Sequence, residues 1–151
     1  MDLLIRRATA TDADQASDLY VRARWSAAAA GSVPAPAHSA DEVSGWVKRV
    51  VIPSLDCWLA HAPEGEVIGI LVLNDDCVDQ LYVDPKLTGR RIGSELLELA
   101  KRERPRGLWL WTFVSNHGAQ RFYERHGFGE VERNDGTGNE ERAPAIRYAW
   151  K

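Results

Sequence analysis

Hydrophobic residues recur along this chain at two spacings, one typical of helices and one typical of strands. Ala16, Leu19, Tyr20 and Ala23 have helical spacing, which predicts a helix over residues 12–29 with one buried face. Shorter apolar runs bounded by turn residues predict strands. The chain is therefore expected to combine helices with a sheet.

A second helix has a clear start and a predicted end. Ser39 and Glu42 fit the capping-box pattern, in which each side chain bonds the backbone N–H of the other residue. We expect Pro53 to end this helix, because proline lacks the N–H that a helix needs. The apolar positions between them keep the i, i+3, i+4, i+7 spacing of a buried face: Val43, Trp46, Val47 and Val50.

Three strands are expected in close succession, at Cys57–Ala62, Val67–Leu73 and Cys77–Val83. Connections this short join antiparallel neighbours, so these strands form a meander. Gly69, inside the second strand, indicates either a bulge or the close approach of another segment.

The remaining elements complete an α+β fold in the order βααβββαβαββ, with about seven strands and four helices in a single domain over residues 1–151. The strand–helix–strand unit over 78–114 has the length of a right-handed crossover. The elements expected outside the meander are a strand at 3–8, a helix from near Arg91 to Pro105, a strand at Leu108–Val114, a helix at Asn116–His126, and strands at Phe128–Arg133 and Ala145–Trp150.

A glycine-bearing loop, Gly89–Ser94, leads from strand 77–83 into the next helix. The first N–H groups of a helix have no intrahelical partner, and the helix dipole adds positive charge there, so such a loop can hold phosphate. The chain lacks the pattern G-x-x-x-x-G-K-[ST], which argues against a nucleoside triphosphate as the ligand.

The composition, with 44% apolar and 27% charged residues, is ordinary for a soluble globular protein. A net charge of −3 argues against general binding to nucleic acid or to an anionic membrane. No apolar run approaches the roughly 20 residues that span a bilayer, and no leader pattern opens the chain, so we expect a cytoplasmic protein. Cys57 and Cys77 lack metal-site spacing and lie two strands apart in the predicted sheet, so we expect buried free thiols and no metal.

Three motifs resemble those of the Gcn5-related N-acetyltransferase (GNAT) superfamily. The first, L-Y-V-x-P followed by a glycine-bearing loop, I-G and L-L, spans Leu81–Leu97. The second, N-x-x-A-x-x-F-Y-x-x-x-G-F, spans Asn116–Phe128. The third, E-E-R-x-P-x-x-R-Y-x-W, spans Glu140–Trp150 and resembles a bacterial subgroup. Together with the element order, the resemblance covers essentially the whole chain.

This resemblance implies acetyl-CoA as the acetyl donor and a mixed, mostly antiparallel sheet that splays between strands 77–83 and 108–114. It implies that the loop N–H groups bind the CoA pyrophosphate and that the pantetheine arm pairs with the end of strand 77–83 like an added strand. A backbone N–H there would polarise the thioester carbonyl. The cofactor-binding residues so implied are Leu81, Tyr82, Val83, Gly89, Arg90, Arg91, Ile92, Gly93, Ser94, Asn116 and Tyr123.

Two residues are candidates for proton transfer. The resemblance implies that Tyr123 protonates the departing thiolate, whereas a core aromatic at helical spacing is the alternative. Asp79, two residues before Leu81, matches the position of a general base, whereas a solvated strand residue is the alternative. Asn116 is implied to contact pantetheine and is also a candidate helix cap.

Several further residues each have two possible roles. Asp75 and Asp76 are either reserve bases or turn residues, and His117 is either a base or a surface residue of the first helical turn. Trp25, Trp46 and Trp58 fall in the half of the chain that shapes the acceptor pocket in this superfamily, and core packing is the alternative for each. The acidic pair in Asn139–Glu141 would favour a cationic amine or is part of a solvated loop.

The phosphate loop departs from the superfamily pattern Q/R-x-x-G-x-G/A. Thr88 stands where glutamine or arginine is usual, and Arg91 stands where a glycine lets phosphate approach the backbone without meeting a Cβ atom. Arg91 retains its N–H, and its guanidinium can add a phosphate contact.

Two functions are compatible with these observations. The first is acetyl-CoA-dependent N-acetyl transfer to a small-molecule or peptide amine by direct attack, because no serine or cysteine lies in a nucleophile pattern. The second is a non-catalytic CoA- or acyl-CoA-binding regulatory module on the same fold. The sequence determines neither the acceptor nor the oligomeric state, so a homodimer stays open.

Overall fold

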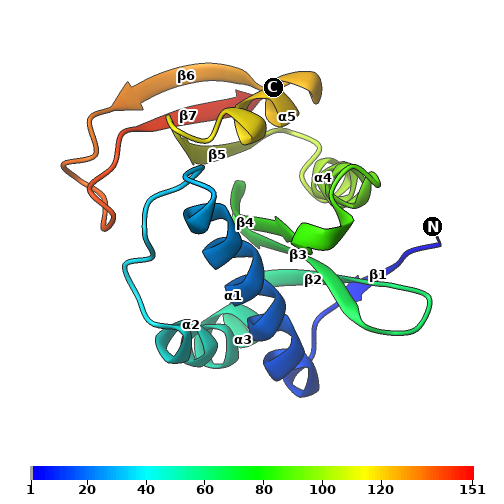
Figure 1. The fold of residues 1–151 in the computed structure, drawn as a ribbon. Helices are drawn as coiled ribbons and strands as arrows, with labels where there is room; N and C mark the ends of the chain where they lie inside the picture. Colours follow the sequence, from blue (N-terminus) through cyan, green and yellow to red (C-terminus); the bar gives the residue numbers. More distant parts are fainter. Residues whose placement is uncertain (1) are drawn as a thin grey trace.

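A seven-stranded mixed sheet, in the order β1-β2-β3-β4-β5-β7-β6, forms the centre of the computed structural model, which describes residues 2–151 (Figure 1). All neighbouring strands are antiparallel except β4 and β5. The strands are β1 (Leu4–Arg7), β2 (Asp56–His61), β3 (Val67–Asn74), β4 (Cys77–Val83), β5 (Leu108–Phe113), β6 (Gly129–Asn134) and β7 (Ala145–Trp150).

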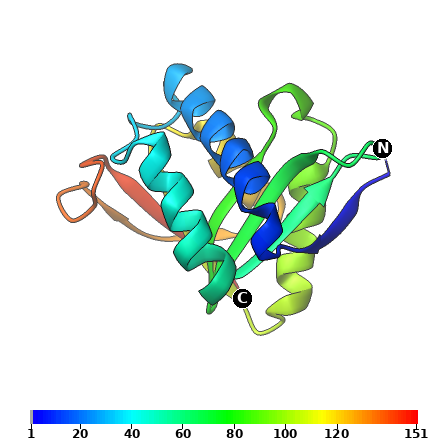
Figure 2. The same cartoon turned by 90° about the horizontal axis from the view of Figure 1, so that it is seen from below.

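The helices cover both faces of this sheet. In Figures 1 and 2, α1 and α2 lie together on one face of the β1–β4 half and α4 lies on the other. Leu19 of α1 and Leu96 of α4 are fully buried, as their apolar spacing predicts. Val50, predicted on the buried face of the second helix, is instead 41% exposed, and Val51 is buried in its place, because the π-helical turn over Val47–Val51 has more residues per turn than an α-helix. The helices are α1 (Ala13–Ala29), α2 (Ala40–Trp46), α3 (Ile52–Ser54), α4 (Ile92–Glu103) and α5 (His117–Arg125), with short turns η1 (Ala10–Asp12), η2 (Val47–Val51) and η3 (Pro85–Leu87).

The predicted α+β fold and its element order are confirmed, and the local corrections lie in the second helix. The second helix does not end before Pro53, because α2, η2 and α3 follow one another without a break as far as Ser54. A proline ring in an α-helix meets the carbonyl four residues earlier. Here the preceding turn, Val47–Val51, is π-helical and therefore wider, and the chain turns extended only at Leu55. The capping box of Ser39 and Glu42 is present as predicted.

The sheet splays between β4 and β5, as expected. The two strands are in register at only one pair of residues, Cys77 and Trp109. On its other side β4 pairs with β3, but Val78 faces Leu73 while Gln80 faces Val72, so Asp79 is the extra residue of a β-bulge. A bulge bends its strand and increases the local twist. Beyond Asp79, the edge of β4 that faces β5 is therefore left without a strand partner.

Gly69 is the point where α4 comes closest to the sheet. A Cβ atom at Gly69 would lie 2.9 Å from Leu96 Cδ1, closer than real Cβ contacts, and 3.2 Å from Ile92 Cγ2, tighter than most of them. The register between β2 and β3 also shifts next to this position, leaving Ile68 unmatched. Both expectations for Gly69, a bulge and a close approach, therefore describe this region.

Gly69→Ala is expected to lower the free energy of unfolding by about 1–3 kcal/mol, because the added methyl group pushes α4 away from β3. Chemical denaturation of the variant measures this loss. Gly129→Ala on the edge strand β6 is the matched control, because a Cβ atom there meets nothing within 4 Å. Equal stability of the two variants would contradict the close packing of α4.

Candidate functional site

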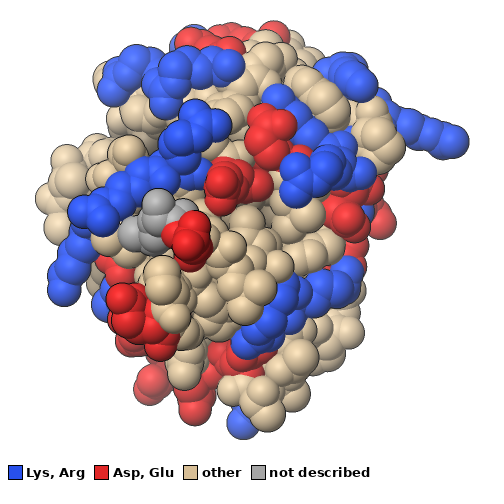
Figure 3. All heavy atoms as spheres, turned by 90° about the vertical axis from the view of Figure 1, so that its right-hand side faces the viewer, with Lys and Arg blue, Asp and Glu red and all other residues tan. Residues whose placement is uncertain are grey.

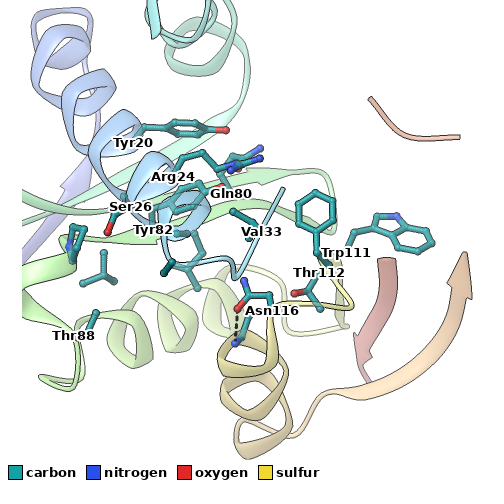
Figure 4. A pocket seen from close by; sticks show the side chains of 18 of the residues that line it. Tyr20, Arg24, Ser26, Val33, Gln80, Tyr82, Thr88, Trp111, Thr112 and Asn116 are labelled. Carbon is teal, nitrogen blue, oxygen red and sulfur yellow. Dashed lines mark hydrogen bonds between the residues drawn. The ribbon is translucent and has the colours of Figure 1, made fainter. Parts of the chain in front are cut away.

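A central cavity of about 610 Å³ lies where β4 and β5 diverge (Figure 4). Its floor is the second half of β4, with Asp79 and Tyr82, and α1 contributes Arg24. Thr112 of β5 and Asn116 before α5 close the other side. The cavity therefore lies over the edge of β4 that β5 leaves unpaired.

A second cavity of about 760 Å³, the loop cavity, adjoins the central one at the start of α4. It is lined by the loop over 87–89 and by the first turn of α4, with α5 opposite. The residues that line both cavities are Leu81, Val83, Thr88, Ala119 and Tyr123. The two cavities thus form one groove that runs from the predicted phosphate loop along β4.

A third cavity of about 590 Å³, the outer cavity, adjoins the central one on the side of α2. Val43 and Trp46 of α2 give it an apolar wall, and Glu140 lies opposite. The residues that line both the outer and the central cavity are Tyr20, Asp79, Gln80 and Glu141. The groove therefore has a second end, away from the phosphate loop.

The loop predicted to bind phosphate forms a turn before α4, in which Arg91 stands where the superfamily has a glycine. Arg91 precedes the first residue of α4 and has a φ of 65°, a left-handed conformation that glycine adopts readily and arginine rarely. Gly89 also has a positive φ, of 80°. The backbone turn is thus formed with arginine in place of glycine. Arg90 is exposed and lines neither the loop cavity nor the central cavity.

Tyr123 lies at the junction of the loop and central cavities, in α5. Its ring is 9% exposed and packs edge-to-face against Phe122 and Phe128, with ring centroids 5.2 and 5.5 Å apart. Burial raises the pKa of the phenol, so Tyr123 carries its proton at neutral pH. The residue is thus a core aromatic whose protonated phenol also borders the groove.

Asn116 caps α5, as the sequence suggested. Its side-chain oxygen accepts a hydrogen bond from the Ala119 N–H at 3.2 Å, drawn as the dashed line in Figure 4. The amide of Gln120 donates to the carbonyls of Phe113 and Val114, which fixes the corner between β5 and α5. These bonds hold the wall of the central cavity beside Tyr123.

Asp79 lies at the other junction, between the central and outer cavities. The bulge leaves it without a partner on β3. It is half-buried, and this burial raises the pKa of its carboxyl group against a smaller opposing effect from the Gln80 amide. Asp75 and Asp76 are exposed in the turn before β4 and line none of the three cavities, so the structure supports their reading as turn residues.

The outer cavity is partly closed by contacts between distant loops. His38, before α2, lies 2.6 Å from a carboxylate oxygen of Glu140, between β6 and β7. This contact with Glu140 raises the pKa of His38. Asn139 bonds the backbone of Ala143 and shapes the same β6–β7 loop. Glu140 and Glu141 thus border the groove, as the acidic-pair prediction requires.

The other candidates from the sequence, three tryptophans and one histidine, differ in burial and in whether they line a cavity. Trp46 lines the outer cavity and packs edge-to-face with Tyr20 at 6.1 Å. Trp58 belongs to the hydrophobic core, and Trp25 packs against the core cluster between α1 and the sheet. His117 is exposed at the start of α5 and lines none of the three cavities.

Arg24 is the functional candidate that the sequence analysis missed. Its side chain extends from α1 into the central cavity, although the residue is only 6% exposed (Figure 4). Neither of its terminal nitrogens has a hydrogen-bond partner among the described residues. The signal was present in the sequence, because Arg24 follows Tyr20 by one helical turn and so lies on the buried face.

The rest of the described chain adds no metal site, and the face that Figure 3 shows carries charges of both signs. No group of three His, Cys, Asp or Glu side chains in residues 2–151 could hold a metal ion. Both cysteines are free, on β2 and β4, although Cys77 is only half-buried. Figure 3 shows bands of Lys and Arg interrupted by Asp and Glu on the face that contains α4. Nor does any helix among these residues have the length and apolarity to cross a membrane.

Comparison with known proteins decides the family. The model of the acetyltransferase (GNAT) domain matches residues 53–130, which run from α3 through the phosphate loop to the start of β6. The chain belongs to the GNAT family. The resemblance to the GNAT superfamily is therefore confirmed, and the first two of the three sequence motifs lie within the matched residues.

Two relatives of this GNAT chain are named as N-acetyltransferases. It is 38% identical over 96 residues to the uncharacterized N-acetyltransferase MJ1207 of Methanocaldococcus jannaschii, covering 60% of this chain and 38% of that protein. It is 31% identical over 84 residues to the peptidyl-lysine N-acetyltransferase YjaB of Salmonella typhimurium, covering 56% of this chain and 57% of that protein. In both comparisons, the matched part is well under two thirds of the relative's length.

The same fold is found in a solved GNAT structure with a ligand. The structure of yncA, a putative acetyltransferase from Salmonella typhimurium with its cofactor acetyl-CoA, superimposes with a TM-score of 0.74. The match covers 100% of this chain and 94% of that one at 16% sequence identity. At this identity the likeness establishes the fold.

Arg91→Gly is expected to raise the free energy of unfolding by about 1 kcal/mol, because glycine removes the left-handed strain at the start of α4. Chemical denaturation without ligand measures the change. Arg91→Ala, which keeps the Cβ atom and removes the exposed charge, is the matched control and should stay close to the parent. If glycine and alanine gave equal stability, the strain at this GNAT loop would be absent.

Proposed function

We propose that this GNAT protein is an acetyl-CoA-dependent N-acetyltransferase that transfers the acetyl group directly to an amine within a ternary complex. The observation that carries the proposal is the groove of three joined cavities. Tyr123 stands at the junction on the donor side and Asp79 at the junction on the acceptor side. A proton donor and a proton acceptor thus flank the cavity in which acyl transfer would occur.

In this proposal the loop cavity holds the CoA pyrophosphate. The N–H groups of Gly89–Ser94 around the start of α4 are the donors, since the first N–H groups of a helix have no intrahelical partner. The pantetheine arm lies along Leu81–Val83, where the β4 edge lacks a strand partner. The acetyl-CoA bound to yncA, on the same fold, supports this choice of donor.

The proposed reaction needs a base on the acceptor side and an acid on the donor side. Asp79 accepts a proton from the ammonium form of the acceptor, and the free amine attacks the thioester carbonyl carbon. A backbone N–H of Leu81–Val83 stabilises the oxyanion. The C–S bond then breaks, and Tyr123 gives its phenolic proton to the departing thiolate. The nitrogen of the new amide returns its extra proton to the Tyr123 phenolate, and the neutral amide and CoA leave.

The positions and the raised pKa values of the two cysteines are consistent with direct transfer. A covalent acetyl-enzyme would require a reactive nucleophile in the groove. Neither Cys57 nor Cys77 lines any of the three cavities, and burial raises the pKa of each thiol to about 12. At neutral pH both therefore remain protonated and weakly nucleophilic.

A non-catalytic module that binds CoA or acyl-CoA is the second candidate function. The observation that favours it is the departure at the phosphate loop, where Arg91 brings a Cβ atom to a position at which the superfamily has glycine. A thermal-shift series with CoA, acetyl-CoA and longer acyl-CoAs, run beside a thiol-release assay over a broad amine panel, separates the two functions. Stabilisation without turnover would establish the regulatory module.

Tyr123→Phe is expected to lower kcat by about 10²–10⁴-fold, because the thiolate then leaves without a proton donor. The melting-temperature shift produced by acetyl-CoA should stay close to that of the parent, since the ring and its packing remain. Thiol release and thermal shift measure the two effects. Tyr148→Phe is the control for loss of a phenol, because Tyr148 donates to Glu124 and lines none of the three cavities. An unchanged kcat would remove the acid role of Tyr123.

Asp79→Asn is expected to lower kcat/KM by about 10²-fold or more and to remove the acidic limb of its pH profile. The same variant should melt at a higher temperature than the parent at pH 7. Burial raises the folded-state pKa of Asp79, so its ionisation lowers the stability of the parent as pH rises above the ordinary carboxyl value of about 4. At about pH 4 the two melting temperatures should therefore converge.

The matched control for this variant is Asp76→Asn, in the exposed turn before β4. It should leave both the pH profile and the melting temperature close to the parent. If Asp79→Asn retained full activity, the base would have to be sought elsewhere.

A further inference from the structure

Arg24 brings an uncompensated positive charge into the central cavity. The guanidinium extends from α1 over β4 toward Gln80 (Figure 4), and the residue is 6% exposed. Both terminal nitrogens lack a hydrogen-bond partner within residues 2–151. No carboxylate of the described chain lies within ion-pair distance of it, although Asp79 and Glu141 line the same cavity.

Such an arrangement is unfavourable in the empty protein. Arginine stays protonated in proteins, so burial cannot be relieved by loss of the charge. Buried charges are therefore almost always paired or fully hydrogen-bonded. The missing partner of Arg24 must be an anionic group that enters the cavity from outside.

The anion does not come from the acetyl donor. The proposed function places the phosphates of the coenzyme in the loop cavity, which Arg24 does not line. The pantetheine arm and the thioester, which would reach the central cavity, carry no charge. The anionic group therefore belongs to the acceptor.

The charges of the cavity favour a carboxylate over a phosphate. Arg24 is the only lysine or arginine among the lining residues of the central cavity, and Asp79 and Glu141 are its two carboxylates. A phosphate group with a charge of about −1.5 to −2 would be undercompensated beside those two acids. A carboxylate carries a single charge and matches the two free nitrogens of the guanidinium in a bidentate pair.

We propose, on the basis of the function proposed above, that the acceptor is a free amino acid whose carboxylate binds Arg24. Its ammonium group then lies toward Asp79 and Glu141, the acids that border both the central and the outer cavity. Its side chain extends into the outer cavity, where Trp46 and Val43 form an apolar wall. A polyamine or the lysine of a peptide has no carboxylate next to its reacting amine and leaves Arg24 unpaired.

The test compares each L-amino acid with its carboxamide, which keeps the amine and side chain but removes the negative charge. Spermidine and a lysine-containing peptide complete the acceptor panel. The parent protein should acetylate its best amino acid with a kcat/KM at least about 10²-fold above that of the matching amide. Equal or better use of the amide, spermidine or the peptide would overturn the proposal.

Arg24→Met tests the role of the side chain itself. The ratio of acid to amide kcat/KM should fall to near one in this variant, and Arg24→Lys, which keeps the charge but loses the planar fork, should give an intermediate ratio. Arg22→Met, on the exposed side of the same helix, is the matched control and should leave the ratio unchanged. An unchanged ratio in Arg24→Met would also overturn the proposal.

Two further measurements separate a binding role from a structural one. Arg24→Met should raise the melting temperature of the ligand-free protein, because it removes an unpaired buried charge, and should keep the shift produced by acetyl-CoA. A lower melting temperature would assign Arg24 to the fold. If acetyl-CoA binds but no acceptor turns over, calorimetric titration of the amino acids into the CoA-saturated protein still decides the matter. Binding that is lost in Arg24→Met supports the carboxylate site, and absence of binding to the parent refutes it.

Discussion

The divergence of β4 from β5 is the constraint on which the rest of the site depends. The two strands share a single register pair, Cys77 with Trp109, and the bulge at Asp79 bends β4 away beyond it. An unpaired strand edge in the middle of a sheet has free backbone donors and acceptors, which another extended chain can satisfy. Here that edge forms the floor of the groove, and α1, α5 and the β6–β7 loop close around it. The bulge that opens the groove also removes the Asp79 carboxyl from the regular alternation of the strand.

Three residues along this groove are energetically unfavourable in the ligand-free protein. Arg24 is a buried cation without a partner, Asp79 has its pKa raised by burial, and Arg91 holds a left-handed backbone. Each is unfavourable for a different physical reason: an unpaired charge, a desolvated carboxylate and a steric clash of Cβ. Away from these residues, most apolar positions of the helices are buried, and Ser39 and Glu42 cap α2. Strain of this kind gathers at functional sites, because groups prepared for a ligand are left unsatisfied without it.

The outer end of the groove, which the proposed function assigns to the acceptor, is assembled from distant segments. Its walls come from segments far apart in the chain, since α1, α2 and the β6–β7 loop all contribute, and His38 contacts Glu140 across the gap. The loop end, in contrast, is built by the continuous stretch from β4 to α4 with α5 opposite, all within the part of the chain that the GNAT domain model matches. Under the proposed function, donor binding thus relies on neighbouring elements, whereas the choice of acceptor depends on how distant segments meet.

The candidate acid and base came from the resemblance to the GNAT superfamily, whereas the sequence by itself determined the elements, their order and the glycine-bearing loop, because helical spacing, capping and turn residues act over only a few positions. It was wrong about the end of the second helix, since a π-helical turn allows the chain to pass Pro53. Only the tertiary structure decided that Tyr123 and Asp79 stand at opposite junctions of one groove, and that Asp79 belongs to a bulge. It also revealed that Arg24 has no partner. Helical register could place Arg24 on the buried face of α1, but the absence of a counter-charge depends on every segment that packs around the cavity.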